Sequence, residues 1–206
     1  MSKLNLPNKL TIIRLLMVPV VLLFLICDFG IAPWNRIIAG VVFLAAALTD
    51  MADGKIARKR NLITDFGKFL DPLADKFLVI SGLITLCFID SLSLTEDDVS
   101  KKVYCYCLFC MTVIVIFREL AVTSLRLVVA SSDEKIVIPA NIFGKIKTGS
   151  QTTFVVLAIV CYPFVYLCPI AIYIALYFTM VFSTVMTILS GVTYFKGYWK
   201  FINPNK

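Results

Sequence analysis

The sequence predicts an all-α integral membrane protein with six transmembrane helices. Three observations support this prediction: 60% of the 206 residues are hydrophobic, only 16% are charged, and the mean hydropathy is +0.91. The surface of a soluble globule carries more charge than this. A spanning helix needs about 20 apolar residues, so 206 residues hold about six spans but hardly a second, soluble domain. We therefore expect a single membrane domain over residues 1–206.

Six apolar runs along the chain are the expected spans. The first, at 10–27, contains Arg14 and lacks a small-residue cleavage site, so we expect a retained helix and not a signal peptide. The second begins near Ile37 and leads through an acidic and then a basic stretch to Arg60. The other runs are at 66–89, 103–130, 152–167 and 170–194.

The positive charges predict the orientation of these spans. Lys and Arg gather at the two chain ends, at 55–60 and at 135–147, which a six-span topology places on one side. Basic residues in short loops mark the cytoplasmic side, so both termini are expected in the cytoplasm. The segment 91–102 fits least well, because it places two lysines outside. The net charge of +7 is explained by orientation and lipid phosphates, and no nucleic-acid partner is expected.

Four aspartates and three small residues form two stripes between the second and third spans. The stripes are Asp50, Asp53, Gly54 and Ala57, and then Gly67, Asp71 and Asp75. Residues three, four or seven apart share one face of a helix, so two antiparallel helices can point these stripes at each other. Four carboxylates that converge at a membrane edge repel one another unless cations neutralise them. Ligands that are all oxygen suit magnesium or manganese, and two such ions can stabilise a phosphoryl transfer.

Simpler interpretations explain this pattern less well. One aspartate at a helix start is commonly a cap, but four on matched stripes, with Gly and Ala between them, favour a binding site. An ion channel or transporter would place its carboxylates near the bilayer midplane, and a structural adaptor has no need of four unpaired aspartates. A zinc site is not expected, because the pair Cys107 and Cys110 has no second pair and the chain has no His.

The chain resembles the CDP-alcohol phosphotransferases. Their signature, D-x2-D-G-x2-A-R-x8-G-x3-D-x3-D, is matched at every fixed position from Asp50 to Asp75. The segments 6–14, 117–119 and 144–148 extend the likeness. The resemblance implies an enzyme of phospholipid biosynthesis that transfers the phosphatidyl group of CDP-diacylglycerol to an alcohol and releases CMP. The extra segments are most similar to members that use glycerol 3-phosphate and form phosphatidylglycerolphosphate. Phosphatidylglycerol (which gives cardiolipin), serine, inositol and choline remain open as acceptors.

The resemblance also implies roles for the signature residues. Asp50, Asp53 and Asp71 match metal ligands, and Asp75 matches a carboxylate near the metals that acts as general base toward the acceptor hydroxyl. The positions that accept the cytidine diphosphate group are matched by Gly54, Ala57, Arg58 and Gly67. Two Mg²⁺ or Mn²⁺ ions are the implied cofactors, at an active site that faces the cytoplasm from the cell membrane. A homodimer is a further open expectation.

An acceptor such as glycerol 3-phosphate needs its own anion site. The candidates are Arg118, Arg126, Lys145 and Lys147, of which Arg118 is preferred because an intramembrane Arg is costly and usually marks a partner or a pathway. Its neighbour Glu119 is expected to face away, since adjacent residues on a helix diverge. The two lysines have a simpler alternative as positive charges of a cytoplasmic loop. Asn8 and Arg14 are weaker candidates for phosphate contact or helix anchoring.

Overall fold

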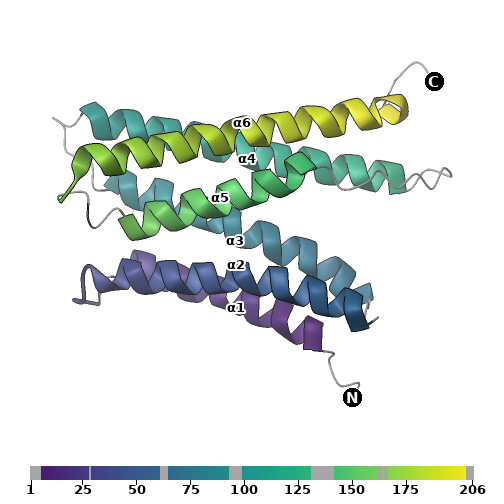
Figure 1. Ribbon diagram of the computed structural model, residues 1–206, viewed down its shortest axis with the longest axis horizontal. Coiled ribbons are helices and arrows are strands. Elements are labelled where there is room, and N and C mark those ends of the chain that lie inside the picture. The colour runs from purple at the N-terminus through teal and green to yellow at the C-terminus, as the bar shows by residue number, and fades with distance from the viewer. Residues whose placement is uncertain are drawn as a thin grey trace.

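The computed structural model describes residues 6–27, 29–60, 65–92, 99–130, 142–161, 164 and 167–202. Over these residues the chain forms six α-helices and no strand, which confirms the all-α prediction. In chain order the helices are α1 (Leu6–Ile26), α2 (Trp34–Arg60), α3 (Asp65–Leu92), α4 (Val99–Ala130), α5 (Ile142–Cys161) and α6 (Pro169–Ile202) (Figure 1).

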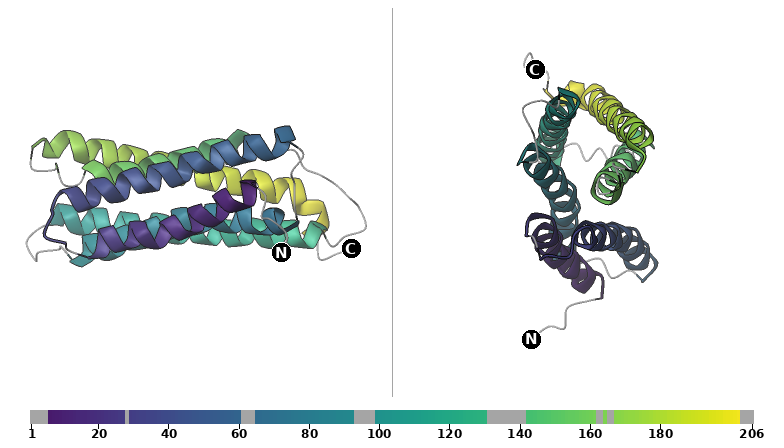
Figure 2. Two further views of the ribbon diagram at one scale, coloured as in Figure 1. Left: turned by 90° about the horizontal axis from the view of Figure 1, so that it is seen from below. Right: turned by 90° about the vertical axis from the view of Figure 1, so that its left-hand side faces the viewer.

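The six helices form one elongated bundle in which successive helices alternate in direction. The start of α1, the end of α2, the start of α3, the end of α4, the start of α5 and the end of α6 all lie toward the same end of the bundle (Figures 1 and 2). We call this the polar end. Among the described residues, the basic side chains of Lys9, Lys145 and Lys196 belong to helix ends that lie here. That this end faces the cytoplasm stays a prediction.

Four of the six described helices have the length and composition of membrane spans. These four contain stretches long and apolar enough to cross a bilayer, at Asn8–Ile26, Leu70–Ile89, Lys101–Val129 and Pro169–Trp199, and α2 has a shorter apolar stretch, Trp34–Thr49. Large apolar side chains such as Phe109 on α4 and Phe178 on α6 are exposed. A surface of this kind would promote aggregation in water but suits contact with lipid. The protein is therefore a helical membrane protein.

The position of the fifth helix differs from the expectation. A span was expected at 152–167, whereas α5 runs from Ile142 to Cys161. Its first half is polar, so hydropathy alone does not detect it, although its backbone makes helical hydrogen bonds like any other segment. Within this half Lys147 and Gln151 are buried in the bundle. Lys145 and Lys147 therefore belong to a helix, which argues against the alternative that they are charges of a loop.

The interior is divided along the bundle axis. On α1 the buried residues Asn8, Thr11 and Arg14 give way to Val18 and Val21 further along. The main apolar core of the bundle lies in the half away from the polar end, and a smaller apolar cluster of Val122, Val129, Tyr194 and Tyr198 lies toward the polar end on α4 and α6. The main core includes Ala39 and Phe43 of α2, Leu83 and Leu86 of α3, Leu108 and Met111 of α4, Phe154 and Ile159 of α5, and Leu176 of α6.

Two glycines allow the close packing of this apolar half. A Cβ atom at Gly40 of α2 would collide with the side chain of Val160 on α5. A Cβ atom at Gly82 of α3 would lie 3.0 Å from both Phe43 and Val155. Small residues let helix backbones approach where no hydrophobic force drives association in lipid. Tight packing in one half leaves the polar half as the place for a cavity.

Candidate active site

A cavity of about 800 Å³ opens in the polar half, between α2, α3, α4, α5 and α6. Eight charged side chains line it, together with Tyr194 and several small or apolar residues. The carboxylates are Asp71, Asp75 and Glu119, and the cations are Lys76, Arg118, Arg126, Lys145 and Lys147. A space that holds both carboxylates and an excess of cations suits a phosphorylated ligand and the metal ions that accompany it.

The acidic side of the cavity is formed by α3. Asp71 and Asp75 are four residues apart, so they project from one face of the helix, and both line the cavity. Asp71 is exposed and Asp75 is half-buried. The hydroxyl of Thr11 on α1 donates a 2.6 Å hydrogen bond to Oδ1 of Asp71. Gly67 lies one turn before Asp71 and is buried. The expected stripe of 67, 71 and 75 is therefore present on one helix.

The remaining signature residues belong to the last turns of α2. Asp50, Asp53, Gly54, Ala57 and Arg58 have helical backbone, but their side chains lie outside the described part of the structure. The preceding turn of α2 reaches the cavity through Leu44, Ala47 and Leu48. The helix that carries these residues is thus a wall of the same cavity, and their side-chain positions stay predictions.

The basic side of the cavity is held together by one carboxylate. Nη1 of Arg118 lies 3.0 Å from Oε1 of Glu119, and Nζ of Lys147 also donates to Oε1. The exposed fractions of these residues are 9%, 7% and 6%. The expectation that Glu119 faces away from Arg118 is wrong, because two long side chains on neighbouring residues can bend toward each other even where their Cβ atoms diverge. Nη2 of Arg118 donates a further 2.5 Å hydrogen bond to Ser190 of α6.

Tyr194 of α6 joins the two arginines. The guanidinium carbon of Arg118 lies 5.4 Å from the centre of its ring and that of Arg126 lies 5.1 Å away. Nη2 of Arg126 donates a 2.8 Å hydrogen bond to the Tyr194 hydroxyl. Guanidinium groups stack favourably on aromatic faces, so the ring fixes both arginines beside the cavity. Sequence reasoning missed Tyr194, because an aromatic residue at the end of a membrane span is common.

Lys76 is a fifth cation of the cavity that sequence reasoning also missed. It follows Asp75 directly on α3, and its ammonium donates to the hydroxyl of Thr123 on α4. That hydroxyl in turn donates a 2.6 Å hydrogen bond to the backbone oxygen of Glu119. The clue in the sequence was a lysine beside the last signature aspartate. Its position next to the proposed general base makes it relevant to any anionic acceptor.

The described residues fit a hard metal ion, although they do not complete a site. Asp71 and Asp75 supply only carboxylate oxygens, which magnesium and manganese prefer. Among the described side chains no group of three or more His, Cys, Asp or Glu residues is placed to hold a metal. The other two expected ligands, Asp50 and Asp53, are outside that set. The seven cysteines are free, and Cys107 and Cys110 are both exposed.

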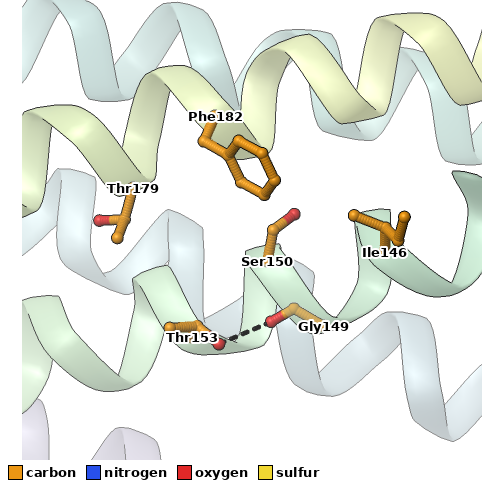
Figure 3. A pocket seen from close by; sticks show the side chains of 6 residues that line it. All are labelled: Ile146, Gly149, Ser150, Thr153, Thr179 and Phe182. Carbon is orange, nitrogen blue, oxygen red and sulfur yellow. Dashed lines mark hydrogen bonds between the residues drawn. The ribbon is translucent and has the colours of Figure 1, made fainter.

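A smaller pocket of about 290 Å³ lies between α5 and α6 (Figure 3). Its lining residues are Ile146, Gly149, Ser150, Thr153, Thr179 and Phe182, none of which is charged. The hydroxyl of Thr153 donates a 2.8 Å hydrogen bond to the backbone oxygen of Gly149. Thr179 donates in the same way to Ala175 within its own helix. The pocket therefore lacks a charged group for chemistry, and the larger cavity is the candidate active site.

The structure is a membrane bundle with a cavity in its polar half, and the cavity is lined by carboxylates and by a cluster of cations. Such a site is typical of membrane enzymes that act on phosphorylated substrates. Comparison with known proteins identifies the family. The CDP-alcohol phosphatidyltransferase family matches residues 4–189. This chain therefore belongs to the CDP-alcohol phosphatidyltransferase family, whose members generally depend on divalent metal ions.

Relatives with assigned names cover most of the chain. The CDP-diacylglycerol–glycerol-3-phosphate 3-phosphatidyltransferase of Bacillus subtilis is 36% identical, over 95% of this chain and 96% of its own length. A probable phosphatidylglycerophosphate synthase of Mycobacterium tuberculosis is also 36% identical, over 92% of this chain and 79% of its own. The CDP-diacylglycerol–glycerol-3-phosphate 3-phosphatidyltransferase of Rickettsia typhi is 37% identical over 71% of each chain.

Proposed function

We propose that this protein transfers the phosphatidyl group of CDP-diacylglycerol to glycerol 3-phosphate, which yields phosphatidylglycerolphosphate and CMP. The names of its relatives support this reaction. The observation that carries the proposal is the cavity in which Asp71 and Asp75 face a cluster of five cations. A transferase with two phosphorylated substrates needs one site for the diphosphate and its ions and another for the phosphate of the acceptor. The cavity offers chemistry for both.

The donor site is assigned to the ends of α2 and α3. Gly54, Ala57 and Gly67 leave room for the cytidine diphosphate group, and Arg58 holds a phosphate through its planar guanidinium. The metal ligands are Asp50, Asp53, Asp71 and Asp75, with two Mg²⁺ or Mn²⁺ ions as the expected complement. When bound, such ions offset the negative charge of the diphosphate and of the leaving group.

The transfer itself forms one bond and breaks another. The acceptor's hydroxyl oxygen bonds to the phosphorus of the phosphatidyl group, and the bond from that phosphorus to the CMP oxygen breaks. CMP leaves with the bonding electron pair. Asp75 is assigned as the base that accepts the hydroxyl proton, since it is a half-buried carboxylate that lines the same cavity as Asp71 and the cations.

The acceptor phosphate is assigned to the cationic side. Arg118, Arg126 and Lys147 are held in place by Glu119, Ser190 and Tyr194. Lys145 is exposed and lines the same cavity. Guanidinium groups held in position bind phosphate with little loss of side-chain entropy. An uncharged acceptor such as inositol would gain nothing from these four cations, and the single carboxylate of serine would use fewer of them than a phosphate dianion. The cluster therefore favours a phosphorylated acceptor.

The membrane setting matches the donor. The acyl chains of CDP-diacylglycerol lie in the bilayer, while its diphosphate is at the interface, where the polar end of the bundle is expected. We place the protein in the cell membrane as a multi-pass enzyme whose active site faces the cytoplasm, on the distribution of Lys and Arg. A homodimer remains a prediction.

The decisive assay supplies purified protein in detergent with CDP-diacylglycerol, a divalent metal and one acceptor at a time. The acceptors are glycerol 3-phosphate, phosphatidylglycerol, serine and inositol. We expect glycerol 3-phosphate to give the fastest CMP release, with phosphatidylglycerolphosphate identified by mass spectrometry. Faster turnover with any other acceptor would refute the assignment of glycerol 3-phosphate as the acceptor. The chain would still belong to the family.

A further inference from the structure

The bond between Thr11 and Asp71 connects two helices far apart in sequence. Thr11 lies on α1, its exposed fraction is 0%, and its hydroxyl donates to Asp71 of α3 across a separation of 60 residues. The O···O distance is 2.6 Å, within the range for O–H···O hydrogen bonds. Asp71 itself is exposed to the cavity.

This contact belongs to a polar stripe on an otherwise apolar helix. Asn8, Thr11 and Arg14 are all buried and recur every three residues, so they lie on the inward side of α1. Further along, the same side carries Val18 and Val21. Buried polar groups in a membrane span are costly and are kept where they contact another polar group or serve a site. On α1 they occur only toward the polar end of the bundle.

We propose that Thr11 is a positioning residue that orients Asp71 for metal binding. This inference rests on the proposed function, in which Asp71 is a metal ligand. The hydroxyl holds Oδ1 and so fixes the rotation of the carboxylate about its Cβ–Cγ bond. The second oxygen, Oδ2, would then be left to hold the ion. Hydrogen bonds to metal ligands from surrounding residues commonly set ligand orientation and metal affinity in this way.

A purely structural role for Thr11 makes a different prediction. In that case the bond only fastens α1 to α3, and its loss lowers stability without a specific effect on metal binding. The pair Gln151 and Thr187 offers a matched control. Nε2 of Gln151 on α5 donates a 2.9 Å hydrogen bond to Thr187 on α6, and Thr187 is also 0% exposed. Neither residue lines the cavity.

The test compares five proteins of residues 1–206 in lipid nanodiscs: the parent, Thr11→Val, Thr11→Ser, Asp71→Asn and the control Thr187→Val. Valine has nearly the shape of threonine but lacks the hydroxyl, whereas serine retains it. Binding of Mn²⁺ is titrated by electron paramagnetic resonance in the absence of substrate, and the melting temperature is measured without metal. Thr11→Ala serves as a second variant without the hydroxyl, in case the valine variant does not fold.

We expect Thr11→Val to weaken Mn²⁺ binding by a factor on the order of 10 to 100, the range typical of groups that orient metal ligands. Thr11→Ser should bind within about threefold of the parent, because its hydroxyl reaches the same oxygen. Thr187→Val should lower the melting temperature and leave Mn²⁺ binding unchanged.

Two other results would overturn the inference, and they are distinguishable. If Asp71→Asn weakens Mn²⁺ binding but the variants without the Thr11 hydroxyl do not, Thr11 is structural and the proposed function stands. If Asp71→Asn binds Mn²⁺ like the parent, Asp71 is not a ligand. The metal assignment in the proposed function then fails together with the inference.

Discussion

At the scale of single residues, Arg118 is the best-anchored cation that the described part of the site shows. It is paired with Glu119, bonded to Ser190 and stacked on Tyr194. Its Nε is buried and has no hydrogen-bond partner among the described residues. Such a guanidinium is fixed in orientation before any ligand arrives. We therefore expect it to contribute to acceptor binding more than the exposed Arg126 and Lys145 do.

Replacement of Arg118 by Ala should lower kcat/KM for glycerol 3-phosphate by a factor of about 10 to 100. This corresponds to loss of a charge-assisted contact of about 1.5–3 kcal/mol. The KM for CDP-diacylglycerol should change much less. Arg118→Lys should rescue poorly, because an ammonium cannot reproduce the planar fork of the guanidinium. Steady-state kinetics with each substrate varied in turn provide the measurement.

The control for this variant is Lys196→Ala, since Lys196 of α6 is exposed and does not line the cavity. It removes one positive charge from the same end of the bundle, so it reports any effect of net charge alone. If Arg118→Ala lowered kcat/KM equally for both substrates, the result would count against an acceptor-specific role for Arg118.

The carboxylates carry a second prediction at this scale. Asp71 and Asp75 supply oxygen ligands only, so a chelator in excess should abolish CMP release, and Mg²⁺ or Mn²⁺ added beyond the chelator should restore it. Zn²⁺ should restore it poorly, because it prefers sites with nitrogen or sulfur ligands. CMP release is followed at several free metal concentrations. Full activity with all divalent ions chelated would refute the metal assignment.

At the scale of secondary-structure elements, Glu119 connects α4 to α5. Its carboxylate is shared by Arg118 of its own helix and Lys147 of the next. Removal of one partner from a buried ionic group is strongly destabilising, typically by about 3–5 kcal/mol, because the remaining charges stay buried. The carboxylate of Glu119 therefore joins the two helices.

Glu119→Gln should lower the melting temperature of the protein without ligand. Glycerol 3-phosphate should then raise the melting temperature more in this variant than in the parent, because its phosphate supplies the missing negative charge. Thermal unfolding with and without glycerol 3-phosphate measures both effects. Ser190→Ala is the control, since it removes a neutral partner of Arg118 and should leave the ligand-induced shift as in the parent. The same shift in Glu119→Gln and parent would contradict this role.

At the scale of the whole molecule, the alternating direction of the helices predicts which residues lie on the same side of the membrane, and this can be measured by labelling. Lys145 and Lys196 lie on the polar half of α5 and near the end of α6, whereas Trp34 and Leu167 lie at the opposite end of the bundle. All four residues are exposed. In a chain whose native cysteines are replaced by alanine, single cysteines at 145 and 196 should react with a membrane-impermeant reagent from the cytoplasmic side. Cysteines at 34 and 167 should react from the other side.

Labelling of positions 145 and 167 from the same side would contradict the six-span topology. Labelling of 145 and 196 from the outer side alone would keep the topology but invert the orientation. The cysteine-free chain, with no cysteine reintroduced, is the control for background labelling.

The sequence by itself determined the class of fold and the acidic half of the site. Only helices and closed barrels satisfy every backbone group in lipid. Apolar runs as long as those in this sequence fit helices, because barrel strands are about half as long. The spacing of Asp71 and Asp75 places them on one face because helix periodicity is local. Both conclusions depend only on residues close together in the chain, so they could be drawn before the structure. The start of α5 could not be placed, because its polar first half carries no hydropathy signal.

Only the tertiary structure decided which faces of different helices meet. Thr11 contacts Asp71 across 60 residues, Lys147 reaches Glu119 across 28, and Arg126 reaches Tyr194 across 68. Sequence spacing shows which residues share a face of one helix, but not which face of another helix lies opposite. That choice depends on how the apolar half packs, including the close approach at Gly40 and Gly82. The partners of the charged groups follow from this packing, and they fix the geometry of the cationic side.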